Sequence, residues 1–138
     1  MIQNLSVKSV YKISFPSNGD IRGVLTSIED DISIPFEIKR IFYMHHVTQD
    51  RGGHAHMDTD QVIIPICGSM KVKVFDGLKE DVYLLDNCTE GLFTPRLTFC
   101  DLYDFSPDAV CLVLANTHYD MGKSLRNLAD FLEFIKIK

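Results

Sequence analysis

The sequence contains no pair of cysteines spaced as CxxC and no apolar run long enough to cross a membrane. Its four cysteines are scattered, which disfavours a zinc site or a disulfide framework and favours buried thiols. The N-terminal segment MIQNLSVKSVYKISF lacks the charged and then apolar pattern of a secretory signal. We therefore expect a cytoplasmic protein without a membrane-spanning segment.

Positively charged residues are fewer than negatively charged ones: the sequence has 14 Lys and Arg and 19 Asp and Glu, which gives a formal net charge of -5. Nucleic-acid binding rests on a surplus of positive charge, so this balance argues against a nucleic-acid partner. A phosphorylated small molecule stays possible, since a pocket can be locally basic on an acidic protein. The length of 138 residues and the apolar content of 46% predict one globular domain, residues 1–138.

Short segments rich in β-branched and aromatic residues, separated by turn residues, run through most of the chain. Strands are expected near Ser6–Ser14, Ile38–Val47, Gln61–Cys67, Met70–Phe75, Val82–Leu85, Leu92–Thr94, Phe99–Tyr103 and Ala109–Ala115. Breaks are expected at Ser17–Asp20, at Arg51–Gly53 and at Asp76-Gly77, which is a strong hairpin signal. This series predicts an all-β antiparallel sandwich or barrel.

The C-terminal tail has helical periodicity, with Ser124 as the expected N-cap. Its apolar face recurs at steps of three and four residues: Leu125, Leu128, Ala129, Leu132 and Ile135. We expect this helix to pack that face on the barrel. Pro65 lies inside an apolar strand and cannot donate a ladder hydrogen bond, so that strand is expected at an edge or locally irregular.

Two histidines in the stretch RGGHAH lie one residue apart, so on a strand His54 and His56 share a face. The spacing to Gln61 and then to Gly68 looks like the first cupin motif, in which metal-binding members have a glutamate where Gln61 stands. The segment GLFTPRLTFC supplies no further histidine, and two imidazoles alone rarely hold a metal. Acid–base chemistry is the favoured alternative, because imidazole exchanges protons near neutral pH.

Several stretches together resemble one family: KRIFYMHHV, RGGHAH, GSMKV, FSPDAVCLVLANTHYD and LRNLADF. They are similar to the sugar nucleotide 3,4-ketoisomerases, a metal-independent cupin family also described as WxcM-like. The resemblance implies a cupin jelly-roll barrel with a C-terminal helix, a homodimer and no cofactor. It also implies the substrate dTDP-4-keto-6-deoxyglucose, whose ketone moves from carbon 4 to carbon 3 through an enediolate, on a route to deoxyamino sugars of glycans.

The resemblance and the strand geometry make His56 the leading base and His54 its partner, although the order is open. Arg51 is expected to stabilise the enediolate or the diphosphate. Tyr43 is a candidate for a hydrogen bond to the sugar or a proton relay. Substrate contacts are expected from Arg40, Arg51, Lys71 and Asp101. Phe99 stands where the family usually has a tryptophan.

Other readings of these residues stay open. The same fold supports sugar nucleotide epimerases, which pair the base with a tyrosine across the barrel, as well as metal-dependent and non-catalytic cupins. In the adjacent pair His45-His46, His45 is expected on the same strand face as Tyr43. Phe42 and Met44 are expected on the outward face, in a dimer contact. His118 is expected to lie outside the site.

Overall fold

The computed structural model describes residues 9–137, which form two five-stranded antiparallel sheets, a hairpin and a C-terminal helix. The first strands are β1 (Tyr11–Ser14), β2 (Ser17–Asp20), β3 (Gly23–Thr26), β4 (Arg40–His45), β5 (Arg51–His56) and β6 (Gln61–Cys67). Then follow β7 (Met70–Phe75), β8 (Glu80–Leu85), β9 (Glu90–Thr94), β10 (Phe99–Tyr103), β11 (Val110–Ala115), the 3-10 turn η1 (Met121–Lys123), β12 (Ser124–Leu125) and α1 (Leu128–Ile137).

The two sheets form a jelly-roll sandwich, as the sequence predicts. Sheet 1 has the order β1-β9-β6-β11-β4 and sheet 2 the order β12-β5-β10-β7-β8. Because side chains alternate across a strand, each sheet sends every second residue into the space between the two. The main core cluster draws on both sheets, with Ile63 and Val113 from sheet 1 and Val72 and Leu102 from sheet 2.

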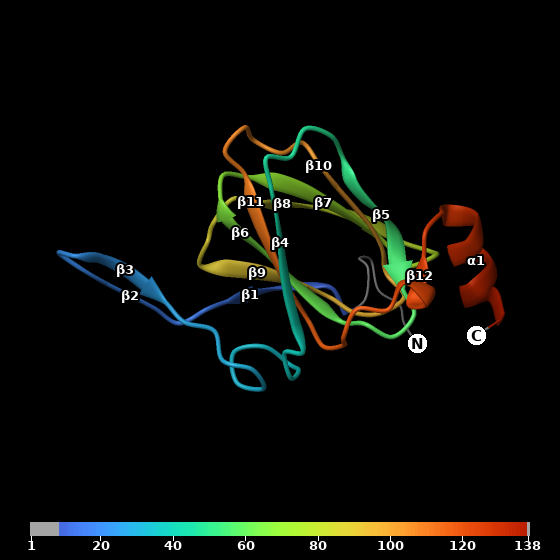
Figure 1. Ribbon diagram of the computed structural model, residues 1–138, viewed down its shortest axis with the longest axis horizontal. Coiled ribbons are helices and arrows are strands. Elements are labelled where there is room, and N and C mark those ends of the chain that lie inside the picture. Colours follow the sequence, from blue (N-terminus) through green and yellow to red (C-terminus); the bar gives the residue numbers. More distant parts are fainter. Residues whose placement is uncertain (1–8, 138) are drawn as a thin grey trace.

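Two smaller clusters close the outer faces of the sandwich. On sheet 1, Ile34 and Phe36 from the segment between β3 and β4 pack against Val62 and Ile64. At the opposite end from the β2–β3 hairpin, α1 packs Phe131, which is 0% exposed, against β5 and β10 (Figure 1). The tail is therefore part of the fold next to the strand that carries both predicted site histidines.

Strands in the body of the sandwich match the sequence prediction closely. β6, β7 and β10 have the predicted bounds, and the Asp76-Gly77 hairpin joins β7 to β8, with Asp76 accepting from Leu78 and Lys79. Pro65 lies in an inner strand, but at a register shift against β11, so the predicted irregularity is confirmed. The predicted Ser6–Ser14 strand is observed as Tyr11–Ser14, and its residues 6–8 lie outside the described part.

Two predicted breaks are wrong. Ser17–Asp20 is a strand that pairs with β3 in a projecting hairpin, because the turn comes three residues later than its Asn-Gly-Asp signal indicates. Gly52 and Gly53 lie inside β5, where one extra residue is accommodated as a bulge against β10. Glycines can take the positive φ that such a bulge requires, so here they continue a strand.

The predicted helix start and the predicted face of β4 are also wrong. Ser124 belongs to β12, and the helix is capped by Asn127, whose side chain accepts from the Asp130 amide at 2.8 Å. An edge pairing with β5 therefore outcompetes an earlier helix start. On β4, Met44 packs on the interior cluster, so Phe42 and Met44 point inward and Tyr43 and His45 point outward.

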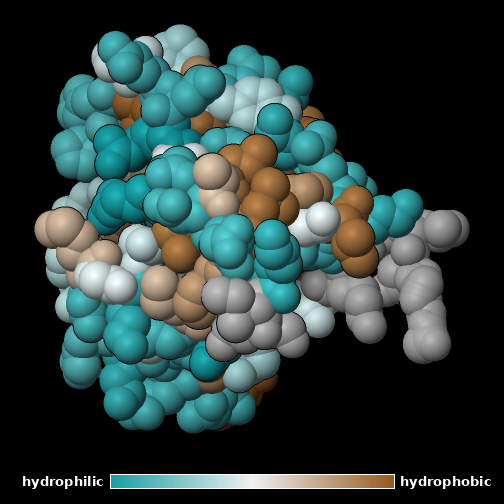
Figure 2. Space-filling model, turned by 90° about the vertical axis from the view of Figure 1, so that its right-hand side faces the viewer, coloured by the Kyte–Doolittle hydropathy of each residue, from teal (hydrophilic) through white to brown (hydrophobic). Residues whose placement is uncertain are grey.

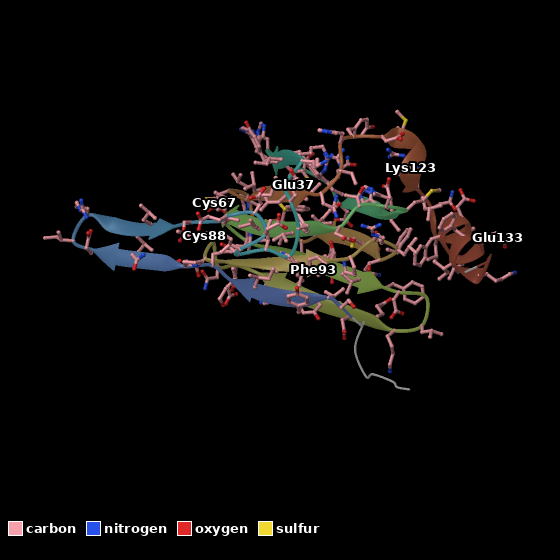
Figure 3. All side chains as sticks on the ribbon, turned by 90° about the horizontal axis from the view of Figure 1, so that it is seen from below. Glu37, Cys67, Cys88, Phe93, Lys123 and Glu133 are labelled. Atoms are coloured by element: carbon pink, nitrogen blue, oxygen red, sulfur yellow. The ribbon has the colours of Figure 1, made fainter. Side chains whose placement is uncertain are left out.

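The surface is mostly polar on the α1 end, where hydrophobic residues gather in small groups (Figure 2). Exposed apolar side chains on this helix include Leu128 and Leu132. Cys67 and Cys88 are free and exposed, and they lie at the end of the sandwich near the β2–β3 hairpin (Figure 3). Within residues 9–137, no helix is long and apolar enough to cross a membrane.

Candidate active site

The bulge in β5 sets the position of the two site histidines. Cys100 pairs with His54, whereas the next residue of β10, Asp101, pairs with Gly52, so Gly53 is the extra residue. Gly52 and Gly53 have φ values of 90° and 71°, and a Cβ on Gly52 would meet the backbone oxygen of Cys100 at 2.8 Å. Glycine is therefore required at Gly52 for β5 to approach β10 this closely.

Both imidazoles point into the sandwich from β5. Their ring centroids are 5.0 Å apart and their planes are nearly perpendicular, at 89°. The side-chain amide nitrogen of Gln61 lies 3.2 Å from Nε2 of His56. An amide nitrogen can only donate, so Nε2 of His56 accepts this hydrogen bond and its proton sits on Nδ1 in the neutral ring. Gln61 thus fixes the tautomer of His56.

The electrostatic surroundings keep His56 neutral. Burial lowers the pKa of His56 to about 4, and repulsion from the nearby His54 and Arg40 acts in the same direction. Such a ring is uncharged near pH 7 and is a weak base, but it can still donate a hydrogen bond. Burial likewise raises the pKa of the Cys100 thiol to about 12, so this neighbour is uncharged as well.

An inner cavity of about 200 Å³ opens between the sheets in front of the histidines. Sheet 2 contributes Arg51, Gly52, His54, His56, Cys100 and Leu102 to its lining. Sheet 1 contributes Phe42, Tyr43, Met44, Gln61, Ile63, Thr94 and Val113. The cavity therefore has one wall that carries imidazoles and a guanidinium, and a facing wall of mostly apolar and uncharged polar side chains.

A larger outer cavity of about 460 Å³ adjoins the first and shares Phe42, Arg51, Thr59 and both histidines with it. Its other lining residues are Arg40, Ile41, Asp58, His118, Tyr119, Asp120, Ser124 and Arg126. The guanidinium of Arg40 lies over the rings of Phe42 and Tyr119, at 5.3 and 5.4 Å from their centroids. Its buried Nε has no hydrogen-bond partner among residues 9–137, so within this part of the chain the cation has an unused donor.

Comparison with known proteins identifies the family of this chain. A family model described as FdtA: WxcM-like, C-terminal, matches residues 8–136. The chain belongs to the FdtA family. The TDP-4-oxo-6-deoxy-alpha-D-glucose-3,4-oxoisomerase of Aneurinibacillus thermoaerophilus is 35% identical over 125 residues, which are 89% of this chain and 90% of that protein.

Solved structures of FdtA-like enzymes agree with the fold. A mutant of the 3,4-ketoisomerase QdtA from Thermoanaerobacterium thermosaccharolyticum, in complex with TDP-4-keto-6-deoxyglucose, has a TM-score of 0.91 and 33% identity over 96% of this chain and 97% of its own. A 3,4-ketoisomerase from Helicobacter canadensis has a TM-score of 0.90 and 32% identity over 93% and 98%. The family predicted from the sequence is therefore confirmed, and with it the isomerase class.

Some of the predicted site residues of this FdtA-family chain line the two cavities, and others do not. His54, His56 and Arg51 line both cavities, and Arg40 lines the outer one. Tyr43 borders the inner cavity, but it is 62% exposed and its ring packs beside His45 on the outward face of β4.

Two predicted substrate contacts lie elsewhere. Lys71 pairs with Asp104, at 3.2 Å, and lines neither cavity. Asp101 also lines neither, because it alternates with Cys100 and Leu102, which do point inward.

Three residues of the FdtA-like site escaped the sequence analysis. His118 lines the outer cavity, so the expectation that it lies outside the site is wrong; the chain returns past β4 before η1. Arg126 lines the same cavity because β12 pairs with β5 beside His56. The sequence analysis considered Gln61 only as a poor metal ligand. The same cupin-like spacing that relates Gln61 to the histidines could also have predicted its contact with His56. No cluster of three or more His, Cys, Asp or Glu side chains suited to a metal occurs in the described part of the chain.

Proposed function

We propose that this protein converts TDP-4-keto-6-deoxyglucose into a TDP-3-keto-6-deoxyhexose. Family membership supports the reaction class, and the observation that carries the proposal is the paired imidazoles at the junction of two adjoining cavities. Proton abstraction next to a ketone needs a base beside the sugar and a donor for the oxyanion. This pair supplies both without a cofactor.

The two cavities suit the two halves of the substrate. The smaller inner cavity takes the sugar, since it lies between the sheets and is the more enclosed of the two. The outer cavity takes the nucleoside diphosphate, because its described lining sets Arg40, Arg51 and Arg126 against two carboxylates, those of Asp58 and Asp120. The free Nε–H of Arg40 is one donor available to a phosphate oxygen.

In the proposed reaction, His54 removes the proton from carbon 3. This reverses the order expected from the sequence, because Nε2 of His56 already accepts from Gln61 and the pKa of His56 is too low for an effective base near pH 7. The C3–H electron pair forms the C3=C4 bond, and the charge on O4 is stabilised by Nδ1–H of His56 and by Arg51. The proton on O3 then passes to O4, carbon 4 takes the proton from His54, and the ketone is left at carbon 3.

The proposal extends to a homodimer in the cytoplasm. The β2–β3 hairpin projects from the sandwich, with Val24 and Leu25 69% and 65% exposed, and Ile41 on β4 is 57% exposed (Figure 1). Apolar surface of this kind favours contact with a second copy. Four free thiols suit a reducing compartment. Sedimentation of the purified protein tests the dimer, and Val24→Glu combined with Leu25→Glu should yield a monomer.

The deciding experiment is incubation with TDP-4-keto-6-deoxyglucose in deuterated water, followed by NMR. Isomerisation moves the ketone to carbon 3, and carbon 4 gains deuterium to the extent that the proton on His54 exchanges with the solvent before it is returned. An epimerase would exchange hydrogen next to the ketone but leave the ketone at carbon 4, and a binding protein would exchange nothing.

Histidine variants test the assigned roles in the same assay. His54→Asn should lose about 100-fold or more of the turnover, within the range contributed by a general base. His45→Asn is the matched control, because it makes the same change at an exposed ring outside both cavities. Equal turnover of His54→Asn and the control would remove His54 as the base.

A further inference from the structure

The connection between β5 and β6 crosses from sheet 2 to sheet 1 and separates His56 from Gln61. His56 is the last residue of β5, and Gln61 is the first residue of β6. Their side chains meet between the sheets, where the Gln61 amide nitrogen lies 3.2 Å from Nε2 of His56. Connecting segments are more mobile than the strands they join. The contact between the two side chains therefore depends on what holds this connection in place.

Asp60, the last residue of the connection, is the centre of a dense hydrogen-bond network. Its side chain is 20% exposed, and its carboxylate accepts from the backbone amide of Arg96 at 2.8 Å and from Nε and Nη2 of that arginine at 3.2 Å each. The carboxylate also accepts from Nδ2 of Asn116 at 3.1 Å. The Asp60 amide donates to Oδ1 of Asn116 at 2.9 Å, and the Asp60 carbonyl accepts from the Asn116 amide at 3.2 Å. One residue thus joins three segments that are distant in sequence.

Arg96 extends this network to the other side of the contact. It lies between β9 and β10, and the next residue, Leu97, donates its backbone amide to the carbonyl of His56 at 2.8 Å. Leu97 has a φ of 62°, a conformation that costs energy in a residue other than glycine and persists where the surroundings impose it. Asp60 directly precedes Gln61, so the ion pair of Asp60 and Arg96 connects the segment that carries Gln61 to the segment that binds His56.

We propose that Asp60 and Arg96 form a clamp that positions His56 against Gln61 for proton transfer. This inference rests on the proposed function. Both are positioning residues, because neither belongs to the described lining of either cavity and their effect passes through Gln61 and Leu97. The clamp does not touch the substrate, so its loss should slow the chemical step and leave nucleotide binding unchanged. A displacement of about 1 Å in a catalytic group can lower a rate by about 100-fold, so even partial loosening is measurable.

Asp60→Ala removes the carboxylate that accepts all the side-chain bonds of the clamp. In the NMR assay with TDP-4-keto-6-deoxyglucose, kcat should fall by about 10-fold or more while KM stays within about 2-fold. Lys71→Met is the matched control, because it breaks an ion pair of equal length, 3.2 Å to Asp104, that borders neither cavity. Equal kcat in Asp60→Ala and in the control, or a rise in KM alone, overturns the inference.

The His56 ring provides a readout that needs no turnover. In the unchanged protein its proton sits on Nδ1, so the two ring nitrogens should have well separated ¹⁵N shifts near pH 7. In Asp60→Ala the contact with Gln61 loosens, the proton is shared between the two nitrogens, and their shifts should converge. A folded variant with a lower thermal transition and unchanged ring shifts would show that Asp60 has only a structural role, and the inference would fail.

The ring shifts also separate this inference from the proposed function. If the unchanged protein moves no ketone, the proposed function is refuted, and the ¹⁵N shifts of His56 in Asp60→Ala decide the clamp on their own. Converging shifts would then support it, and unchanged shifts would overturn it.

Arg96→Met keeps the inference testable if Asp60→Ala does not fold. The Arg96 side chain is 49% exposed, and in this variant Asp60 keeps the backbone amide of residue 96 and the amide of Asn116 as donors. The kcat and the ring shifts should change in the same direction as in Asp60→Ala, by smaller amounts. Arg96→Lys should recover part of the kcat, because it restores the charge without the forked geometry. An Arg96→Met protein with the kcat and the His56 shifts of the unchanged protein would contradict the clamp.

Discussion

Replacing Gln61 by glutamate should raise the pKa of His56 substantially. In the unchanged protein this pKa is about 4 against an ordinary value of 6.5, which corresponds to about 3 kcal/mol in favour of the neutral ring at about 1.4 kcal/mol per pKa unit. Burial is the largest cause of that difference. The amide of Gln61 lies 3.2 Å from Nε2 of His56, so a carboxylate in its place would adjoin the ring directly.

The expected size follows from Coulomb's law. Opposite unit charges about 4 Å apart attract by about 4 kcal/mol at an effective dielectric constant near 20. We halve this attraction to allow for the partial exposure of His56, which leaves about 2 kcal/mol. At about 1.4 kcal/mol per pKa unit, this would bring the pKa of His56 to about 5.5. The neutral tautomer would also change, because a carboxylate accepts where the amide donates.

Heteronuclear NMR titration of the histidine rings from pH 3.5 to 8 measures this change, with His56→Asn used to assign the signals. Gln61→Met is the matched control, since it keeps the bulk of the side chain without charge and should leave the pKa of His56 low. If His56 of the unchanged protein titrates near 6.5, or if Gln61→Glu and Gln61→Met titrate alike, the account of this site is wrong.

Three further outcomes follow from the same structure. Because the folded-state pKa of His56 lies below its unfolded value, the stability that the neutral ring contributes is complete above pH 6.5 and is lost as the pH drops toward 4. The free energy of unfolding from urea titrations should therefore fall between pH 7 and pH 4.5 by about 1–2 kcal/mol more in the unchanged protein than in His56→Asn. Gly52→Ala should cost about 1–3 kcal/mol and most of the turnover, whereas Gly53→Ala, whose Cβ meets only Asp101 Oδ1 at 3.4 Å, should cost less in a thermal melt. Treatment of the unchanged protein with a chelator should leave turnover unchanged, and a loss of turnover would contradict the metal-free mechanism. Gln61→Glu completes a three-ligand set with His54 and His56, so this variant should gain Zn²⁺ binding that calorimetry can measure.

Much of the sandwich was predictable because its strands are specified locally. The bounds of β6, β7 and β10 follow from β-branched and apolar runs between turn residues, and Asp76-Gly77 acts as the hairpin turn it resembles. The β2–β3 hairpin was missed because β2 is polar and both strands are almost wholly exposed, so no alternating burial pattern identifies them. The start of α1 depended on a partner distant in sequence, since the pairing of β12 with β5 determines where the helix can begin.

The site was predictable where a motif is contiguous and unpredictable where tertiary structure assembles it. Spacing alone placed His54 and His56 on one face, and the structure shows their rings in contact. Nothing local brings His118 and Arg126 to the same cavity, because two separate chain returns place them there. The face of β4 was assigned wrongly because Ile41, Phe42, Tyr43 and Met44 are all large and apolar or aromatic, so alternation gives no contrast.

The pairing of β12 with β5 makes the C-terminal segment a latch on the strand that carries His54 and His56. Ser124 and Leu125 pair with His56 and Ala55, and Phe131 fills the space behind them. Without this latch, β5 would become a bare sheet edge, open to strand addition by another molecule. Proteolytic cleavage before β12 should therefore first abolish turnover and then cause aggregation. A bulky protein fused after α1 would strain the same strand.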